Sequence, residues 1–192
     1  MTGEEEGEKR NRGRPERGPT PRQGEETSEQ MGWRLFAYRR LLLIGVIVVV
    51  LDQLSKAWIM GRLPYGTYGE GEGAITVIPG FFYLVHVCNT GAAWSLFSGR
   101  SAVLAAVAAV TLAAIFFWRR HLGLHSGRVQ IYFGLLCGGI IGNFADRLRH
   151  GHVIDFIDLH FGRYAYPTFN LADCGICVGV ALYFIQSLRK SA

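Results

Sequence analysis

The residues best suited to chemistry are aspartates that stand near asparagines in the second half of the sequence. Asn143 precedes Asp146 by three residues. Asn170 precedes Asp173 by the same interval. Residues three apart share one face of a helix, so each pair can present an amide and a carboxylate together. Asp155 lies between the two pairs, eighteen residues before Asp173, and one loop can close that separation.

Two facing carboxylates at the end of a membrane span would not both ionise comfortably. The pKa of one would rise, and the pair would share a proton. Such a pair can activate a water molecule against a peptide carbonyl, as in aspartic proteases. We therefore expect Asp155 and Asp173 to act together in general acid–base catalysis.

Four apolar segments must position these groups, and they cover residues 41–60, 101–118, 129–145 and 169–188. About 20 largely apolar helical residues cross roughly 30 Å of hydrocarbon, a length that the third segment only just reaches. A soluble helical bundle is the alternative, but residues 101–118 carry no charge and would leave such a helix no solvated face. The predicted fold class is an all-α integral membrane protein with four transmembrane helices.

The segment between the first two spans is predicted to add a little β structure. Residues 74–78 and 81–87 have the pattern of two short strands, joined by a turn at Pro79 and Gly80. Residues 92–97 are expected to form a short interfacial helix that turns Trp94 and Phe97 toward the bilayer. Residues 146–168 are expected to be a loop rich in charged and aromatic side chains.

The distribution of charge predicts the orientation in the membrane. Lys and Arg flank the spans in residues 34–40, 119–128 and 189–190, where no acidic residue occurs. Because Lys and Arg accumulate on the cytoplasmic side, both termini are expected in the cytoplasm and the aspartates at the outer face. The net charge of +5 then reflects the membrane topology. The sequence lacks the basic stripe interleaved with aromatic residues that would indicate nucleic-acid binding.

The first thirty residues differ from the rest of the chain in composition. They hold eight Glu and six Lys or Arg, with almost no apolar side chains. Such a segment cannot bury enough surface to offset the entropy of ordering it. We expect a disordered cytoplasmic tail over residues 1–32 and a four-span membrane domain over residues 33–192.

Several polar residues allow two readings. Asp52 and Lys56, four apart in the first span, form either a structural ion pair with Lys56 snorkelling to the headgroups or a support for the active site. Cys174-x-x-Cys177 looks like a redox motif, but within a span small cysteines are expected to serve packing. Asp158 is expected to be a loop or helix-cap residue.

Metal and serine chemistry have weaker support. The metalloprotease motif His-Glu-x-x-His is absent, but His150 and His152 lie near Asp155 in the sequence, which leaves a zinc site as a minor alternative. No Gly-x-Ser-x-Gly motif supports a serine nucleophile. No metal and no cofactor are expected, because carboxylates supply both acid and base.

Five motifs follow one another along the sequence: Asp52-x-x-Ser55-Lys56, Asn89-x-Gly91-x-Ala93, Gly142-Asn143-x-x-Asp146-Arg147, Val153-x-Asp155-Phe156-x-Asp158 and Phe169-Asn170-x-Ala172-Asp173. Together and in this order they resemble the signature blocks of the lipoprotein signal peptidase (signal peptidase II) family, over about residues 38–188. The sequence departs from the family pattern at Trp94, where Phe is usual, and at Cys88, where a polar residue is usual. These departures concern substrate or inhibitor preference more than chemistry.

The resemblance implies an aspartic endopeptidase of the bacterial inner membrane with a small extracytoplasmic β-cradle. It implies cleavage of diacylglyceryl-modified prolipoproteins just before the lipidated cysteine, by a monomer in contact with membrane lipids. The catalytic aspartates carry over to Asp155 and Asp173. The substrate-binding or supporting residues carry over to Asp52, Lys56, Asn89, Gly91, Asn143, Asp146, Arg147 and Asn170.

Two other classes of protein remain as alternatives. A small proton-coupled transporter could use the same acids as a relay, although acids distributed through the bilayer and paired half-helices would then be expected. A non-catalytic membrane adaptor could recruit a partner through the tail. Cleavage of a lipidated precursor would separate an enzyme from both.

Overall fold

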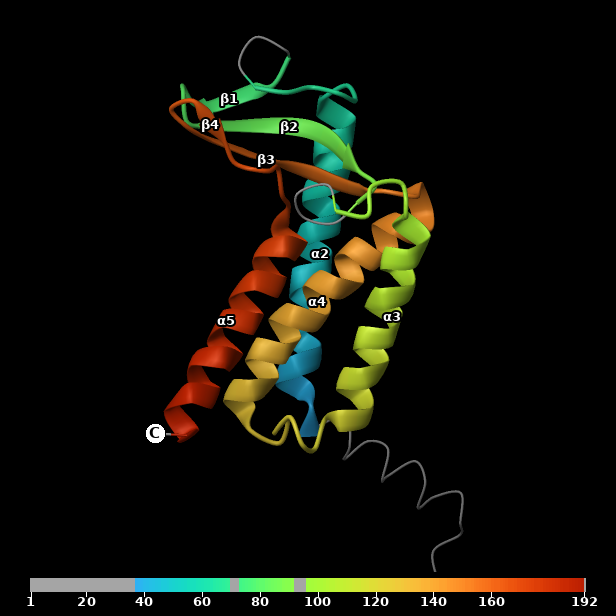
Figure 1. The fold of residues 1–192 in the computed structure, drawn as a ribbon, viewed down its shortest axis with the longest axis vertical. Coiled ribbons are helices and arrows are strands. Elements are labelled where there is room, and N and C mark those ends of the chain that lie inside the picture. The colour runs from blue at the N-terminus through green and yellow to red at the C-terminus, as the bar shows by residue number, and fades with distance from the viewer. Residues whose placement is uncertain (1–36, 70–72, 92–95, 192) are drawn as a thin grey trace, which may run out of the picture. The chain divides into compact units, whose positions relative to one another are not determined.

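The computed structural model describes residues 37–69, 73–91 and 96–191. The expected tail over residues 1–32 and Trp94 lie outside this part of the chain. The helices are α2 (Arg39–Arg62), α3 (Ser101–Trp118), α4 (Gly127–His150) and α5 (Leu171–Ser191), and the strands are β1 (Ile75–Ile78), β2 (Phe82–Asn89), β3 (Val153–Phe161) and β4 (Tyr164–Ala165). Figure 1 shows the sheet at one end of the four helices. These elements belong to one compact unit, Ala37–Ala192.

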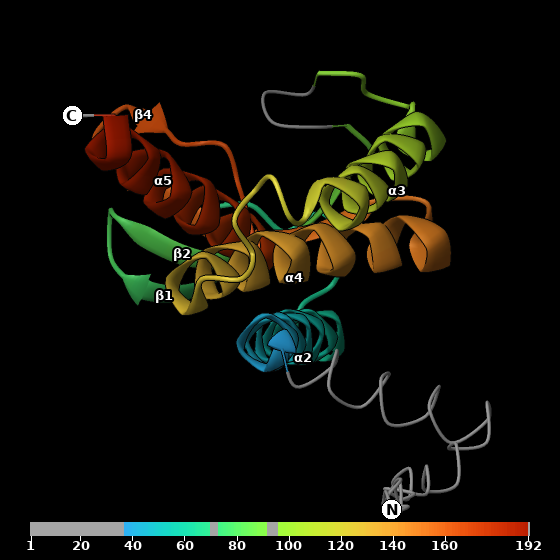
Figure 2. The same cartoon turned by 90° about the horizontal axis from the view of Figure 1, so that it is seen from below.

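In the described part of the chain, four helices are long and apolar enough to cross a membrane, which confirms the predicted spans. Helix α4 lies between α2 on one side and α3 and α5 on the other, as the view from below in Figure 2 shows. Of its most apolar stretch, 61% is buried inside the protein, against 6% for α3. Helix α4 therefore forms the centre of the bundle, whereas in α3 only Ala105 is buried.

Small residues let α2 and α5 approach α4 closely. A Cβ atom placed on Gly138 would lie 2.8 Å from the carbonyl oxygen of Gly45 in α2. A Cβ atom on Gly139 would collide with the carbonyl oxygen of Ala172 in α5. Helix pairs in lipid gain most from this kind of close van der Waals contact. The same approach brings polar groups of α2 and α5 against the end of α4.

The sheet is antiparallel, in the order β1-β2-β3-β4. Strands β1 and β2 confirm the prediction for residues 74–87. The expectation of a loop over residues 146–168 is wrong, because this segment contains the end of α4 and both remaining strands. Gly151 ends α4 in the left-handed conformation, at φ 76°, and turns the chain directly into β3. Of the helix expected at residues 92–97, residues 92–95 lie outside the described part, and the residues that follow form a turn.

Strand β3 pairs with β2 along nearly its whole length, so that Asp155 lies opposite Val87 and Val153 opposite Asn89. A register shift between Leu84 and Val87 interrupts the ladder. Bulges of this kind re-aim side chains next to functional sites. Here the shift precedes the three residue pairs that bring Asp155 beside the end of β2.

Candidate active site

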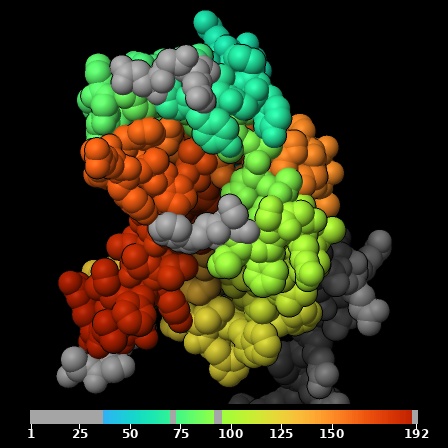
Figure 3. All heavy atoms as spheres, turned by 45° about the horizontal axis from the view of Figure 1, so that its top comes forward, coloured from blue at the N-terminus to red at the C-terminus, as the bar shows by residue number. Residues whose placement is uncertain are grey.

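Asp155 and Asp173 line one cavity, of about 1060 Å³, at the end of the helices nearest the sheet. Asp155 comes from β3 and Asp173 from the first turn of α5. The space-filling view in Figure 3 shows the recess between the orange residues of the sheet and the red residues of α5. We call this space the catalytic cavity. The structure thus brings together the two aspartates that the sequence pairs.

A local hydrogen-bond motif places Asp173. The side-chain oxygen of Asn170 accepts the backbone N–H of Asp173 at 3.0 Å, and Oδ2 of Asp173 accepts the backbone N–H of Asn170 at 3.2 Å. This reciprocal arrangement is a capping box at the start of α5. Asn170 and Asp173 are three residues apart, and this interval allows them to cap the helix together. The same hydrogen bonds hold the carboxylate of Asp173 in place.

Two amides hold Asp155. Nδ2 of Asn89 donates to Oδ2 at 3.0 Å, and Nδ2 of Asn170 donates to Oδ1 at 2.7 Å. Burial, and next the nearby charge of Asp173, raise the pKa of Asp155 to about 7, although both hydrogen bonds oppose that rise. The carboxyl of Asp155 is therefore poised to hold or release a proton near neutral pH.

Asn143 connects Asp173 to the rest of the site. Its Oδ1 accepts hydrogen bonds from Nζ of Lys56 at 3.1 Å and from Nδ2 of Asn170 at 3.2 Å. With its oxygen held by two donors, its amide nitrogen must face the other way, where it donates to Oδ1 of Asp173 at 2.7 Å. Lys56 and Asn170 thus determine which end of the Asn143 amide meets the carboxylate.

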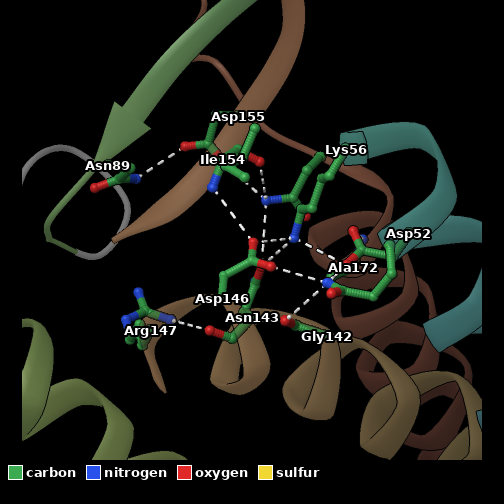
Figure 4. A network of polar contacts seen from close by, with 12 residues as sticks. Asp52, Lys56, Asn89, Gly142, Asn143, Asp146, Arg147, Ile154, Asp155 and Ala172 are labelled. Carbon is green, nitrogen blue, oxygen red and sulfur yellow. Dashed lines mark hydrogen bonds and ion pairs between the residues drawn. The ribbon is translucent and has the colours of Figure 1, made fainter. Parts of the chain in front are cut away.

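Below this layer lies a buried ionic cluster. Nζ of Lys56 is 2.8 Å from Oδ2 of Asp52 and 2.7 Å from Oδ2 of Asp146, and the Lys56 side chain is only 1% exposed. Figure 4 shows Lys56 linked to both carboxylates. Snorkelling of Lys56 to the headgroups is therefore wrong. Because unpaired buried charges are costly, the three groups hold one another in place.

The ionic cluster also fixes two backbone segments. Oδ1 of Asp52 accepts the backbone N–H of Ala172 at 3.0 Å, which anchors the start of α5. Oδ2 of Asp146 accepts the backbone N–H of Ile154 at 3.3 Å, which anchors the start of β3. These two segments carry the aspartates of the cavity, so the cluster positions both from below.

Asn89, Gly91 and Arg147 secure the chain that leaves β2. The backbone N–H of Gly91 donates to Oδ1 of Asn89 at 2.8 Å, so the amide nitrogen of Asn89 is turned toward Asp155. The guanidinium of Arg147 donates to the carbonyl oxygen of Gly91 at 2.9 Å and to that of Asn143 at 3.3 Å. Nε of Arg147 is buried and has no hydrogen-bond partner among the residues that the structure describes. All ten residues expected at the site thus lie in one connected region.

Gln53 belongs to the same network, although sequence reasoning passed over it. Its amide nitrogen donates to Oδ1 of Asp146 at 2.8 Å, and its oxygen accepts from Arg149 at 2.9 Å. Its place beside Asp52, as an amide inside an apolar span, was the signal that could have identified it.

Asp158 lies outside the network. The expectation of a loop or cap residue is wrong, because Asp158 lies within β3 and pairs with Nε2 of His160 at 2.8 Å. Across the described residues, no group of three His, Cys, Asp or Glu side chains is placed to hold a metal ion. The rings of His150 and His152 lie beside each other, 5.9 Å apart, and no third such side chain among the described residues joins them.

Comparisons with known proteins agree with this geometry. A family model described as signal peptidase (SPase) II matches residues 44–189. A lipoprotein signal peptidase from Bacillus pumilus is 37% identical over 146 residues, covering 76% of this chain and 90% of that protein. A lipoprotein signal peptidase from Ralstonia nicotianae is 41% identical over 152 residues, covering 77% and 83%.

A solved structure supports the same assignment. It is described as a bacterial membrane enzyme structure obtained by the in meso method at 2.3 Å resolution. It matches with a TM-score of 0.71 at 32% sequence identity, over 79% of this chain and 89% of the other. Both the sequence and the fold therefore lead to one conclusion: this chain belongs to the signal peptidase II family.

Proposed function

We propose that this chain removes the signal peptide from diacylglyceryl-modified prolipoproteins by cutting just before the lipidated cysteine, with Asp155 and Asp173 as the catalytic pair. Membership of the signal peptidase II family makes it an aspartic endopeptidase that processes lipoprotein precursors. These two residues are chosen because Asp155 of β3 and Asp173 of α5 line the same cavity. Both groups are held there by amides that belong to the same network.

The pair divides the work of acid and base. In this proposal Asp155 holds the shared proton below about pH 7, because burial and next the charge of Asp173 raise its pKa to about 7. Asp173 takes a proton from the attacking water, while Asp155 gives its proton to the carbonyl oxygen of the scissile bond. As the tetrahedral intermediate collapses and its C–N bond breaks, Asp173 gives its proton to the departing amine nitrogen. Asp155 takes a proton from a hydroxyl group of the intermediate, which restores the pair.

The supporting residues act through position. Asn143 and Asn170 hold the carboxylates at a fixed geometry, and a fixed near-attack geometry accounts for a large part of enzymatic rate enhancement. Arg147 holds the chain after β2 through the carbonyl oxygen of Gly91. In this proposal Asn89 and the sheet clamp the precursor's backbone above the aspartates, and Arg147 contributes to its binding.

The proposed setting is the bacterial inner membrane, with both termini in the cytoplasm and the catalytic cavity at the outer face. The support is the distribution of charge: Arg39, Arg119 and Arg189 mark the helix ends away from the sheet, whereas the aspartates gather beside it. Single reporter cysteines at these helix ends should react only with membrane-permeant reagents in intact cells. A monomer in contact with lipid is proposed as the working unit.

Cleavage by the purified protein is the direct test. The protein in detergent micelles should shorten a lipidated precursor and leave an N-terminal lipidated cysteine on the product, as mass spectrometry would show. The same precursor without its lipid should be cut more slowly. If the purified, folded protein releases no signal peptide from the lipidated precursor, the proposal is wrong.

A further inference from the structure

Three cysteine thiols belong to residues of the catalytic cavity. Cys88, Cys174 and Cys177 line it together with Asp155 and Asp173. All four cysteines of the chain are free, and the fourth, Cys137, is buried within α4 away from the cavity. The polar network of the described residues is built from carboxylates, amides and cations, with no thiol hydrogen-bonded into it.

Cys177 has the most favourable position of the three. It follows Asp173 by four residues on α5, so both side chains lie on one face of the helix, about 6 Å apart along its axis. It is exposed, whereas Cys174 and Cys88 are half-buried. Burial, and next the charge of Asp155, raise the pKa of the Cys88 thiol, which lowers the fraction of reactive thiolate at that residue.

We propose that the catalytic cavity is also a covalent modification site, in which Cys177 takes small, uncharged, thiol-reactive compounds and the adduct closes the cavity to precursor. The compounds should be uncharged because Ile176 and Val178 line the same end of the cavity, within a membrane-spanning helix. The effect rests on the proposed function, since the adduct acts by occupying space that the precursor needs. The thiol itself performs no step of the hydrolysis.

The reaction with an alkyl methanethiosulfonate illustrates the chemistry. The Cys177 thiol gives its proton to solvent, and the thiolate attacks the alkyl-bearing sulfur of the reagent. A sulfur–sulfur bond forms to the protein, and the bond to the sulfonyl group breaks. The cysteine sulfur is oxidised to a disulfide and the reagent is reduced, with methanesulfinate as the leaving group. A reducing agent reverses the modification.

Single-cysteine variants test the proposal with a matched control. One variant keeps only Cys177 (C88A/C137A/C174A), and its control keeps only Cys137 (C88A/C174A/C177A). Each is treated in micelles with benzyl methanethiosulfonate, the adduct is measured by mass spectrometry, and cleavage of a lipidated precursor is timed. The Cys177 variant should lose roughly tenfold or more of its rate, because displacements of about 1 Å already cost about 100-fold. Dithiothreitol should restore the rate, and the Cys137 variant should keep its rate throughout.

A second readout does not depend on turnover. Adding Asp155→Asn to the Cys177 variant should leave a protein that binds precursor without cutting it, and bound precursor should slow labelling several-fold. Complete labelling of Cys177 with an unchanged rate, or labelling that precursor does not slow, would overturn the inference. If the untreated protein with all four cysteines folds but cuts no precursor, the proposed function fails instead, so the two failures are distinguishable.

Discussion

The two halves of α4 each bury a carboxamide, and the two amides have different kinds of partners. Gln130, near the start of the helix, donates to the carbonyl oxygens of Ala37 at 2.7 Å and Leu124 at 3.0 Å. Its neighbours are the apolar cluster of Leu124, Val129, Phe133 and Cys137. Asn143, near the end of the same helix, bonds to Lys56, Asn170 and Asp173 through their side chains.

This difference indicates what each amide does. Backbone carbonyl groups do not ionise, so the role of Gln130 is structural. It connects α4 to the loop after α3 and to the chain just before α2. The partners of Asn143 include groups that ionise, so its hydrogen bonds can influence where a proton resides. Burial alone does not distinguish a structural amide from one at an active site, whereas the chemical nature of the partners does.

The largest expected effect comes from the carboxyl pair at the end of α4. Asp155→Asn and Asp173→Asn should each lower the cleavage rate by about 10²–10⁴-fold, because Asn keeps the size of Asp but cannot exchange a proton. The double variant should be hardly slower than either single variant, since residues that act as a unit are non-additive. Rates on a lipidated precursor in micelles, with membrane insertion confirmed for each variant, give the measurement.

Asp158 supplies the control on the same strand. Asp158→Asn removes a carboxylate that pairs with His160 outside the network, so it should cut precursor at close to the normal rate. Near-normal rates from either Asp155→Asn or Asp173→Asn would refute the assignment of that residue.

Matched substitutions of Asn143 and Gln130 test directly whether the two amides of α4 have different roles. Asn143→Ala removes a donor to Asp173 and should slow cleavage by roughly 100-fold through misplacement of that carboxylate. Gln130→Ala removes the donor to two carbonyl oxygens and should lower the free energy of unfolding by about 1–3 kcal/mol, with little change in cleavage rate. Cleavage rate and thermal midpoint are measured for both. A catalytic defect in folded Gln130→Ala would remove the distinction between the two halves.

A smaller effect is expected from pH. The folded protein holds the Asp155 proton up to a pKa of about 7, whereas the ordinary value is 3.8. Between these values the folded state binds more protons than the unfolded state, so stability should fall as pH rises through this window. Cleavage should decline above pH 7 as the same proton is lost.

Asp155→Asn sharpens this test, because it should flatten the fall in thermal midpoint across this window, up to about pH 7. The midpoint is measured in one detergent with buffers of matched ionic strength. An equally steep fall in the variant would assign the pH dependence to another group.

The smallest effect should follow removal of residues 1–30. This segment contains none of the five motifs and almost no apolar side chains, so the proposed catalytic unit, residues 33–192, should retain nearly full activity. Loss of cleavage by a truncated protein that inserts normally would show that the tail contributes to the site.

The sequence alone determined the four spans and the first two strands. A span is predicted when an apolar segment is long enough to cross the bilayer. Strands β1 and β2 are predicted from a local turn at Pro79 and Gly80. It also singled out the amide and carboxylate residues, because polar groups stand out in apolar segments. Strand β3 escaped prediction because its apolar run becomes a strand only when β2 offers a partner.

Only the tertiary structure decided how the polar residues are paired. Lys56 could have reached the headgroups, and it is buried because Asp146, ninety residues away in sequence, supplies a second carboxylate. The raised pKa of Asp155 likewise needs burial and the proximity of Asp173, which no spacing within one element provides. Electrostatic energy depends on distance in space and on the removal of water, and both are fixed only when β3 and α5 meet over α4.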